Sequence, residues 1–155
     1  MGVLLAIRLE KEYHLDLPCE EVWDAIQNPE ILAGILPNCQ SLEPKGENQF
    51  TAYIDVKVGP VRSKFQSSFE MFDLQEPDGY KFRVRGNGKN GSMNGEGEIK
   101  LRANDSGTNF TFIAEGNITG ILARVGQRLI EATGKKLMDQ GFENFKNRVM
   151  GNVVA

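Results

Sequence analysis

Six residues from Gly86 to Gly91 match the glycine pattern Gly-x-Gly-x-x-Gly of dinucleotide-binding proteins. That pattern binds a pyrophosphate where a strand meets the N-terminus of a helix, because the free N–H groups of the helix point at the phosphates. The residues that follow here, Ser92 to Ile99, read as a strand and not as a helix. The context therefore favours a hairpin loop over a nucleotide site.

The single histidine, His14, lies close in sequence to Cys19, so a base and a nucleophile are both present. Both residues flank the start of the first expected helix, and their spacing gives no geometric reason for them to meet. We expect His14 on the surface or at a strand edge, and Cys39 as a buried, inert thiol. Two cysteines and one histidine are too few for a four-ligand structural zinc site. We predict no metal, no cofactor and two free thiols.

Carboxylates are plentiful, so a pair of them is a weak signal by itself. Glu96 and Glu98 share one face of an expected strand. Ile99 has the opposite parity, which predicts that the two glutamates are solvated. Gly95 and Gly97 lie on the apolar parity, where they either leave space for a ligand or allow strand curvature and close approach.

The strongest collective feature is an aromatic and apolar set without a titratable cluster. Its members either pack as a core or line a binding cavity, since ligand sites are mostly apolar with few polar groups. The missing titratable cluster favours binding over turnover, so we predict no catalytic residue in this set. The predicted cavity residues are Phe65, Phe69, Phe82, Met93, Phe110, Phe112, Leu122, Val125 and Leu129.

Composition sets the class of protein. The chain has 155 residues with 18 Lys+Arg and 21 Asp+Glu, a net charge of −3 that argues against nucleic-acid binding. Hydrophobic residues make up 40% and charged residues 25%, as in an ordinary globular chain, and we expect a single domain over 1–155. The apolar start, Met1 to Ile7, is too short for a secretory or membrane-spanning segment, so we expect a cytoplasmic protein.

Residue periodicity predicts the elements that must position these side chains. We expect one strand, two short helices, a run of antiparallel strands and a long amphipathic helix, with about seven strands in all. This is an α+β arrangement in which a curved antiparallel sheet wraps around the C-terminal helix. The helix stripe is expected at Leu122, Val125, Leu129, Ala132 or Thr133, Leu137 and Gly141. The expected ranges are 7–17, 18–27, 29–36, 49–58, 61–71, 80–85, 92–102, 108–118 and 120–149.

Five segments carry a family resemblance over nearly the whole chain, from Ile7 to Val149. The first resembles the opening signature of the START-related, Bet v 1-like (SRPBCC) superfamily, in which a strand leads into a Trp-containing helix and an Asn/Asp-Pro break. The others are similar to the G-subunit family associated with aerobic carbon monoxide dehydrogenase. In order, the segments are 17–33, 35–43, 56–62, 120–130 and 136–142.

The resemblance implies a helix-grip fold with a hydrophobic cavity between sheet and helix. It also implies an accessory role beside a carbon monoxide dehydrogenase-like molybdenum hydroxylase, with lipid or quinone as ligand and peripheral membrane association. Larger members carry a C-terminal extension that can end in a membrane-associating segment. Since this sequence stops at Ala155, we expect that route of attachment to be absent.

Two other functions stay open. Relatives in the superfamily act as cyclases, dehydratases or hydrolases, which would make Asp55, Glu115, Tyr53 or His14 the candidate polar groups. A packed interaction domain without any ligand is the third alternative. The basic residues Arg124, Arg128 and Lys135-Lys136 form either a solvated helix face or a weak contact with anionic lipid or a partner.

Overall fold

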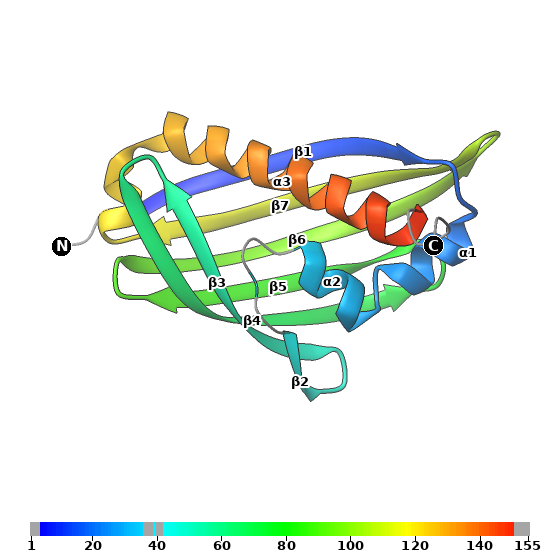
Figure 1. Cartoon of the computed structure of the whole chain (residues 1–155), viewed down its shortest axis with the longest axis horizontal. Helices are drawn as coiled ribbons and strands as arrows, with labels where there is room; N and C mark the ends of the chain where they lie inside the picture. Colours follow the sequence, from blue (N-terminus) through cyan, green and yellow to red (C-terminus); the bar gives the residue numbers. More distant parts are fainter. Residues whose placement is uncertain (1–3, 36–38, 40–41, 151–155) are drawn as a thin grey trace.

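The computed structural model describes residues 4–35, 39 and 42–150 (Figure 1). Seven strands, two short helices, a 3-10 helix and one long helix follow one another along this part of the chain. Their bounds are β1 (Leu4–Leu15), α1 (Cys19–Ala25), α2 (Pro29–Ile35), β2 (Leu42–Gly46), β3 (Gln49–Val58), β4 (Val61–Gln75), β5 (Gly79–Gly88), β6 (Gly91–Asn104), β7 (Gly107–Thr119), η1 (Ile121–Val125) and α3 (Gln127–Met150).

All seven strands form one antiparallel sheet in the order β1-β7-β6-β5-β4-β3-β2. Each strand from β2 to β7 pairs with its neighbour in sequence, while β1 pairs with β7. Helices α1 and α2 carry the chain from the β1 edge to the β2 edge, and α3 lies along the sheet beside β1 with α2 against it (Figure 1). The predicted helix-grip architecture is confirmed.

Alternation along the strands places one face of the sheet inside. On β3, Phe50, Ala52, Ile54 and Val58 are buried, as their period of two predicts. The glycine-rich segment is a hairpin, as expected: Gly88 pairs with the first residue of β6, so two residues make the turn.

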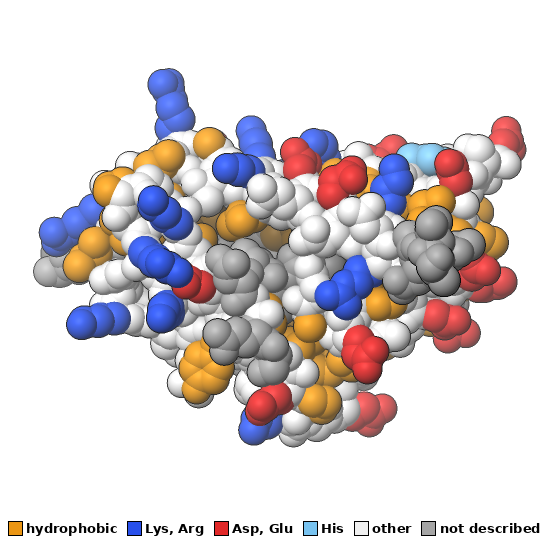
Figure 2. Space-filling model, in the orientation of Figure 1, with side chains coloured by type: hydrophobic (Ala, Val, Ile, Leu, Met, Phe, Trp, Pro, Cys, Tyr) orange, Lys and Arg blue, Asp and Glu red, His pale blue; other side chains and the backbone are white. Residues whose placement is uncertain are grey.

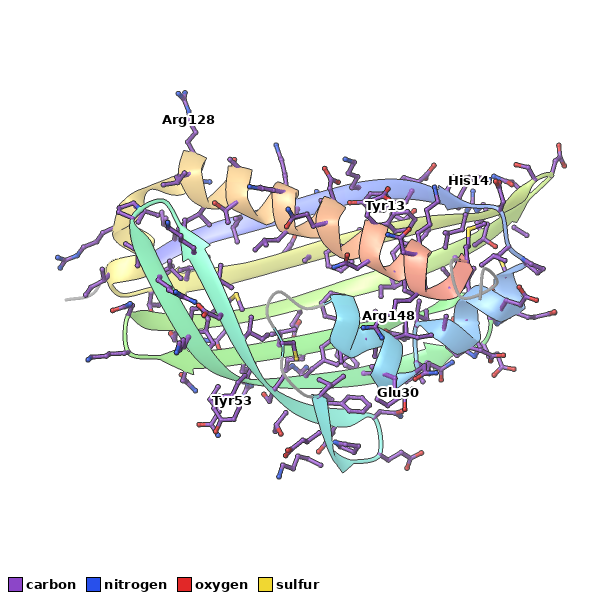
Figure 3. The ribbon with its side chains drawn as sticks, in the orientation of Figure 1. Tyr13, His14, Glu30, Tyr53, Arg128 and Arg148 are labelled. Atoms are coloured by element: carbon purple, nitrogen blue, oxygen red, sulfur yellow. The ribbon has the colours of Figure 1, made fainter. Side chains whose placement is uncertain are left out.

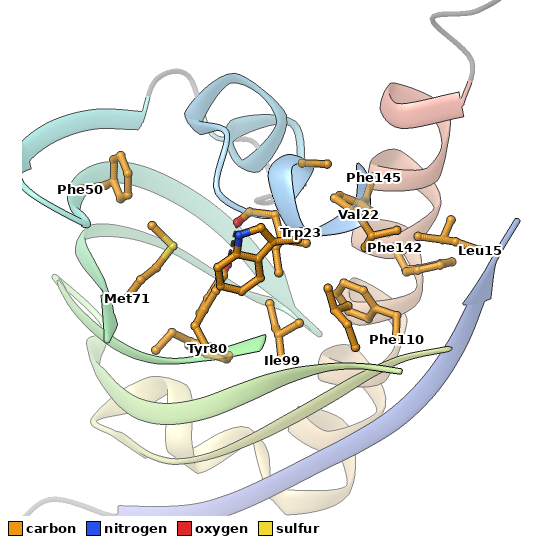
Figure 4. Close-up of a cluster of buried hydrophobic side chains, with 14 residues drawn as sticks. Leu15, Val22, Trp23, Phe50, Met71, Tyr80, Ile99, Phe110, Phe142 and Phe145 are labelled. Carbon is orange, nitrogen blue, oxygen red and sulfur yellow. Dashed lines mark hydrogen bonds between the residues drawn. The ribbon is translucent and has the colours of Figure 1, made fainter. Parts of the chain in front are cut away.

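The interior of the sheet contains two clusters of apolar side chains. The first cluster lies between α1, the C-terminal half of α3 and the sheet (Figure 4); the second lies under η1 and the start of α3. Tyr80 in the first cluster donates a hydrogen bond from its hydroxyl to the Ile26 carbonyl at 2.7 Å, which ties the end of α1 to β5. The buried members of the second cluster are Val58, Phe65, Ile118, Leu122, Ala123 and Ile130, with Leu5, Ile7, Val56, Val61, Met93 and Val125 partly buried against them.

The long helix expected over 120–149 is divided in two, which corrects the sequence prediction. Gly126 has a φ of 102°, a conformation that interrupts helical hydrogen bonding and that glycine adopts without steric cost. The apolar stripe counted through this break loses its phase. Leu129 is 37% exposed, while Ile130, Gly141, Phe142 and Phe145 form the buried side of α3.

Gly97 shows which of its two sequence interpretations holds. A Cβ at this position would overlap the Ile113 carbonyl oxygen and the ring of Phe82. The small residue therefore allows close approach of a neighbouring strand and an aromatic ring, and the space beside it is filled.

Candidate ligand-binding site

A cavity of about 930 Å³ lies between α2, β3 and α3. Residues from three separate parts of the chain form its wall, because α2 packs on α3 and β3 bends past both. The described residues that line it are Glu30, Ala33, Gly34, Cys39, Asp55, Val56, Lys57, Gly59, Thr133, Lys136, Leu137, Gln140, Asn144 and Arg148.

Two polar contacts hold α2 against α3 at one end of this cavity, where Figure 3 shows Glu30 and Arg148. Asn144 donates from its side-chain amide to the Gly34 carbonyl at 3.1 Å, and Arg148 Nη1 donates to the Glu30 carbonyl at 3.4 Å. A Cβ on Gly34 would lie 2.7 Å from Arg148 Nε. The glycine in α2 thus lets the guanidinium lie flat against the helix.

The charges in the wall are unevenly satisfied. Asp55 accepts a two-pronged hydrogen bond from Arg62, at 3.1 Å from Nε and 2.7 Å from Nη2, and this contact lowers the pKa of Asp55. Lys57 and Lys136 form no ion pair with any residue that the structure describes. The wall is therefore polar, with unpaired positive charge and a few apolar side chains such as Val56.

The structure places the nine predicted cavity residues behind this wall, so that none is among its described lining residues. Phe82 and Phe110 are buried in the first cluster, with Phe69 and Phe112 packed against it. Ring centroids 5.7 Å apart for Phe69–Phe82 and 5.5 Å for Phe82–Phe112 make a stacked row on the sheet. Members of the second cluster are Phe65, Met93, Leu122 and Val125.

Leu129, the remaining predicted residue, is partly exposed beside the cavity. Its Cδ2 lies 2.7 Å from where a Cβ on Gly59 would be, and Gly59 lines the wall. That these nine side chains contact a ligand stays a prediction.

Several lining residues were missed because they are polar. On α3 they recur at intervals of three or four residues, which places them on one helix face. That polar stripe was the available signal, whereas the predicted cavity set consists of apolar side chains. Its members are Thr133, Lys136, Leu137, Gln140, Asn144 and Arg148.

The four candidate catalytic groups lie apart. Tyr53 is 63% exposed, and Glu115 pairs with Arg8 at 3.0 Å. His14 bonds to Asn109 at 3.0 Å, a contact that raises the pKa of His14. Of these four, Asp55 is the one among the described lining residues.

The two thiols differ in position. Cys39 lines the cavity and is half-buried, where full burial was expected. Cys19 accepts a hydrogen bond from the Thr108 hydroxyl at 3.3 Å and is not among the lining residues described for the cavity. Within the described ranges, no group of three or more His, Cys, Asp or Glu side chains could hold a metal ion. Nor does any helix in those ranges have the length and apolar character needed to cross a membrane.

Comparison with known proteins adds a family and a fold. The family model that describes the G-subunit of carbon monoxide dehydrogenase (CoxG) matches residues 12–150. A conserved protein from Geobacillus kaustophilus is 31% identical, with 94% of this chain and 95% of that one covered and a TM-score of 0.84. No curated protein matches the chain.

Two more distant structures share the fold. The ZhuI aromatase/cyclase from Streptomyces sp. R1128 is 13% identical over 97% of this chain and 96% of that chain, with a TM-score of 0.64. Ara h 8.0201 is 15% identical over 94% and 99%, with a TM-score of 0.61. At such identities the likeness concerns the arrangement of strands and helices alone.

Proposed function

The chain belongs to the CoxG family of carbon monoxide dehydrogenase, and on that premise we propose that it is a ligand-binding accessory protein. Its ligand is a hydrophobic small molecule, a lipid or a quinone, held between the sheet and the helices. Its partner is a carbon monoxide dehydrogenase-like molybdenum hydroxylase in the cytoplasm. The chain itself contributes no catalytic group to the reaction.

The observation that carries this proposal is the cavity between α2, β3 and α3. Its volume of about 930 Å³ suits a drug-sized molecule. Val56 lies at its wall and also packs against the second cluster, so the polar opening adjoins an apolar interior. An amphipathic molecule could keep its polar end beside Lys57 and Lys136 while burying its apolar part.

We do not propose the alternative of a cyclase- or hydrolase-type enzyme. General acid–base or nucleophilic catalysis needs its groups within hydrogen-bond reach of one substrate. Tyr53, His14 and Glu115 point into other surroundings, and Asp55 is engaged by Arg62.

The two cysteines offer a direct test of ligand binding. Native mass spectrometry of the freshly purified protein first shows whether a lipid or quinone is retained. Iodoacetamide labelling then reports on the cavity: a short-chain ubiquinone analogue or a phospholipid is expected to slow the alkylation of Cys39 and leave Cys19 unchanged. If neither probe changes the Cys39 rate and nothing is retained, ligand binding at this cavity is refuted.

The partner is tested in a host that contains such a hydroxylase. Deleting this chain is expected to lower the hydroxylase activity in cells while leaving the amount of hydroxylase unchanged. Full activity after deletion would contradict the accessory role.

Peripheral membrane contact belongs to the same proposal. Leu4 is 60% and Ile121 52% exposed, and the pairing of Leu4 with Thr119 places them at one end of the sheet. Arg124 and Arg128 lie just beyond, with Arg128 directed away from the body (Figure 3). Figure 2 shows that Lys and Arg gather at this end while Asp and Glu gather at the other. Exposed apolar side chains among cations fit an anionic lipid surface.

Vesicle sedimentation checks the membrane contact. Arg128→Glu is expected to reduce binding to phosphatidylglycerol vesicles several-fold, since each basic residue near an anionic surface contributes about 1 kcal/mol. Lys45→Glu, an equal charge change at an exposed position on β2, is the matched control. Equal binding by both variants would show that this end does not face the membrane.

A further inference from the structure

Two serine hydroxyls on the inner face of β4 are buried without a hydrogen-bond partner. Ser63 is 1% and Ser67 5% exposed, and neither Oγ atom has a partner within the described chain. The third buried hydroxyl, Thr108 Oγ1, donates to the Leu17 carbonyl at 2.7 Å. Because buried polar groups in folded proteins are almost always paired, each orphan needs an explanation.

Ser63 lies directly behind the wall of the cavity. Its neighbours on the same strand face, Val61 and Phe65, belong to the second cluster. Across the sheet it pairs in register with Val56, and side chains so paired lie about 5 Å apart at their Cβ atoms. Val56 in turn lines the cavity, so one side chain separates the orphan hydroxyl from it.

The surroundings of Ser63 define the chemistry of a group that could reach it. The second cluster consists of apolar side chains, and a charged group without a counter-ion is strongly disfavoured there. A neutral oxygen with lone pairs, above all a carbonyl, can accept the proton that the Ser63 hydroxyl has to donate.

On the basis of the proposed function, we propose that the ligand is a mainly apolar molecule with a neutral carbonyl group, bound by a hydrogen bond from Ser63 Oγ. The ligand passes Val56 and enters the second cluster, and its carbonyl satisfies the buried hydroxyl. Quinones and lipid esters both carry such a carbonyl, so the test includes one of each.

The same strand supplies two control positions. Ser67 is the second orphan, but it pairs with Ala52 and Gly86, which are not among the described lining residues, and lies about 13 Å further along β4. Ser68 is exposed on the opposite face. Ser67→Ala therefore removes a buried hydroxyl away from the cavity wall, and Ser68→Ala removes a solvated one.

The experiment measures dissociation constants of three apolar probes for each variant: a short-chain ubiquinone analogue, a fatty-acid methyl ester and an alkylbenzene of similar size. Ser63→Ala is expected to weaken binding of at least one carbonyl probe about tenfold, the loss of one hydrogen bond. The quinone and ester arms show which carbonyl is the natural one. Alkylbenzene binding and the melting temperature without ligand should not fall.

Three results would overturn the inference. In the first, Ser63→Ala binds both carbonyl probes as tightly as Ser68→Ala does. In the second, Ser67→Ala weakens them as much as Ser63→Ala, and in the third, alkylbenzene loses the same factor. If the wild-type chain binds no probe at all, the proposed function fails and this inference fails with it.

Discussion

Replacing Tyr80 by phenylalanine tests how α1 is fixed to the sheet. The Tyr80 hydroxyl lies 2.7 Å from the Ile26 carbonyl, and both residues are at most 2% exposed. Ile26 follows the last helical residue of α1, where carbonyl groups have no partner within the helix. Tyr80→Phe therefore removes a donor and leaves a buried acceptor unpaired.

The expected cost follows from these two effects together. A net hydrogen bond contributes about 1 kcal/mol, and an unpaired buried acceptor brings the total to about 1–3 kcal/mol. For a chain of this size that corresponds to a fall of about 2–12 °C in melting temperature. Burial raises the pKa of Tyr80 above its ordinary value, so the phenol keeps its proton and the difference should not change between pH 6 and 9.

Urea unfolding followed by circular dichroism gives the free energy of unfolding directly. Tyr53→Phe is the matched control, because Tyr53 is 63% exposed and should be neutral. An unchanged m-value would show that the denatured state is not the cause. If Tyr80→Phe stays within about 0.5 kcal/mol of the control, the hydrogen bond does not hold α1 in place.

Two further predictions concern stability. Asp139 accepts hydrogen bonds from Lys11 and Tyr13, at 2.7 Å each, which lower the pKa of Asp139 below its value in the unfolded chain. Its contribution is therefore present above about pH 4 and lost as pH falls through the folded pKa, so the melting-temperature difference between wild type and Asp139→Asn should shrink in acid; a constant difference would contradict this. Gly97→Ala should cost about 1–3 kcal/mol through overlap with a neighbouring strand, whereas Gly46→Ala, with its nearest contact at 3.4 Å, should be nearly neutral in the same urea titration; equal effects would refute the close approach.

Much of the sheet could be predicted because one face of each strand is buried. The alternation in β3 and β4 records that face directly, and turn residues such as Gly59-Pro60 mark the ends. The short strand β2 was not predicted, since its five residues contain Pro44 and only Leu42 is shielded from solvent. A strand at the sheet edge has too little burial to leave a pattern.

The candidate site was harder to predict than the fold. Its wall joins Glu30, Asp55 and Arg148, which come from three elements far apart in sequence, so no local motif contains them. Polar residues on a helix are ordinarily solvated, and the contact of α2 with α3 that turns them into a cavity wall is a tertiary effect. The break at Gly126 likewise depends on a backbone conformation that residue type permits but does not require.

The pairing of β1 with β7 has a consequence for how the molecule assembles. Leu4 pairs with Thr119, a separation of 119 − 4 = 115 residues, whereas β2 to β7 pair as successive hairpins. Closing so long a loop costs more chain entropy than closing a hairpin, and contacts of high sequence separation form slowly. We therefore expect the hairpins to form first and β1 to dock last, so that in pulse-labelled refolding the amides of β1 should gain protection after those of β5 and β6. The first strand to leave the ribosome would then be the last to join the sheet.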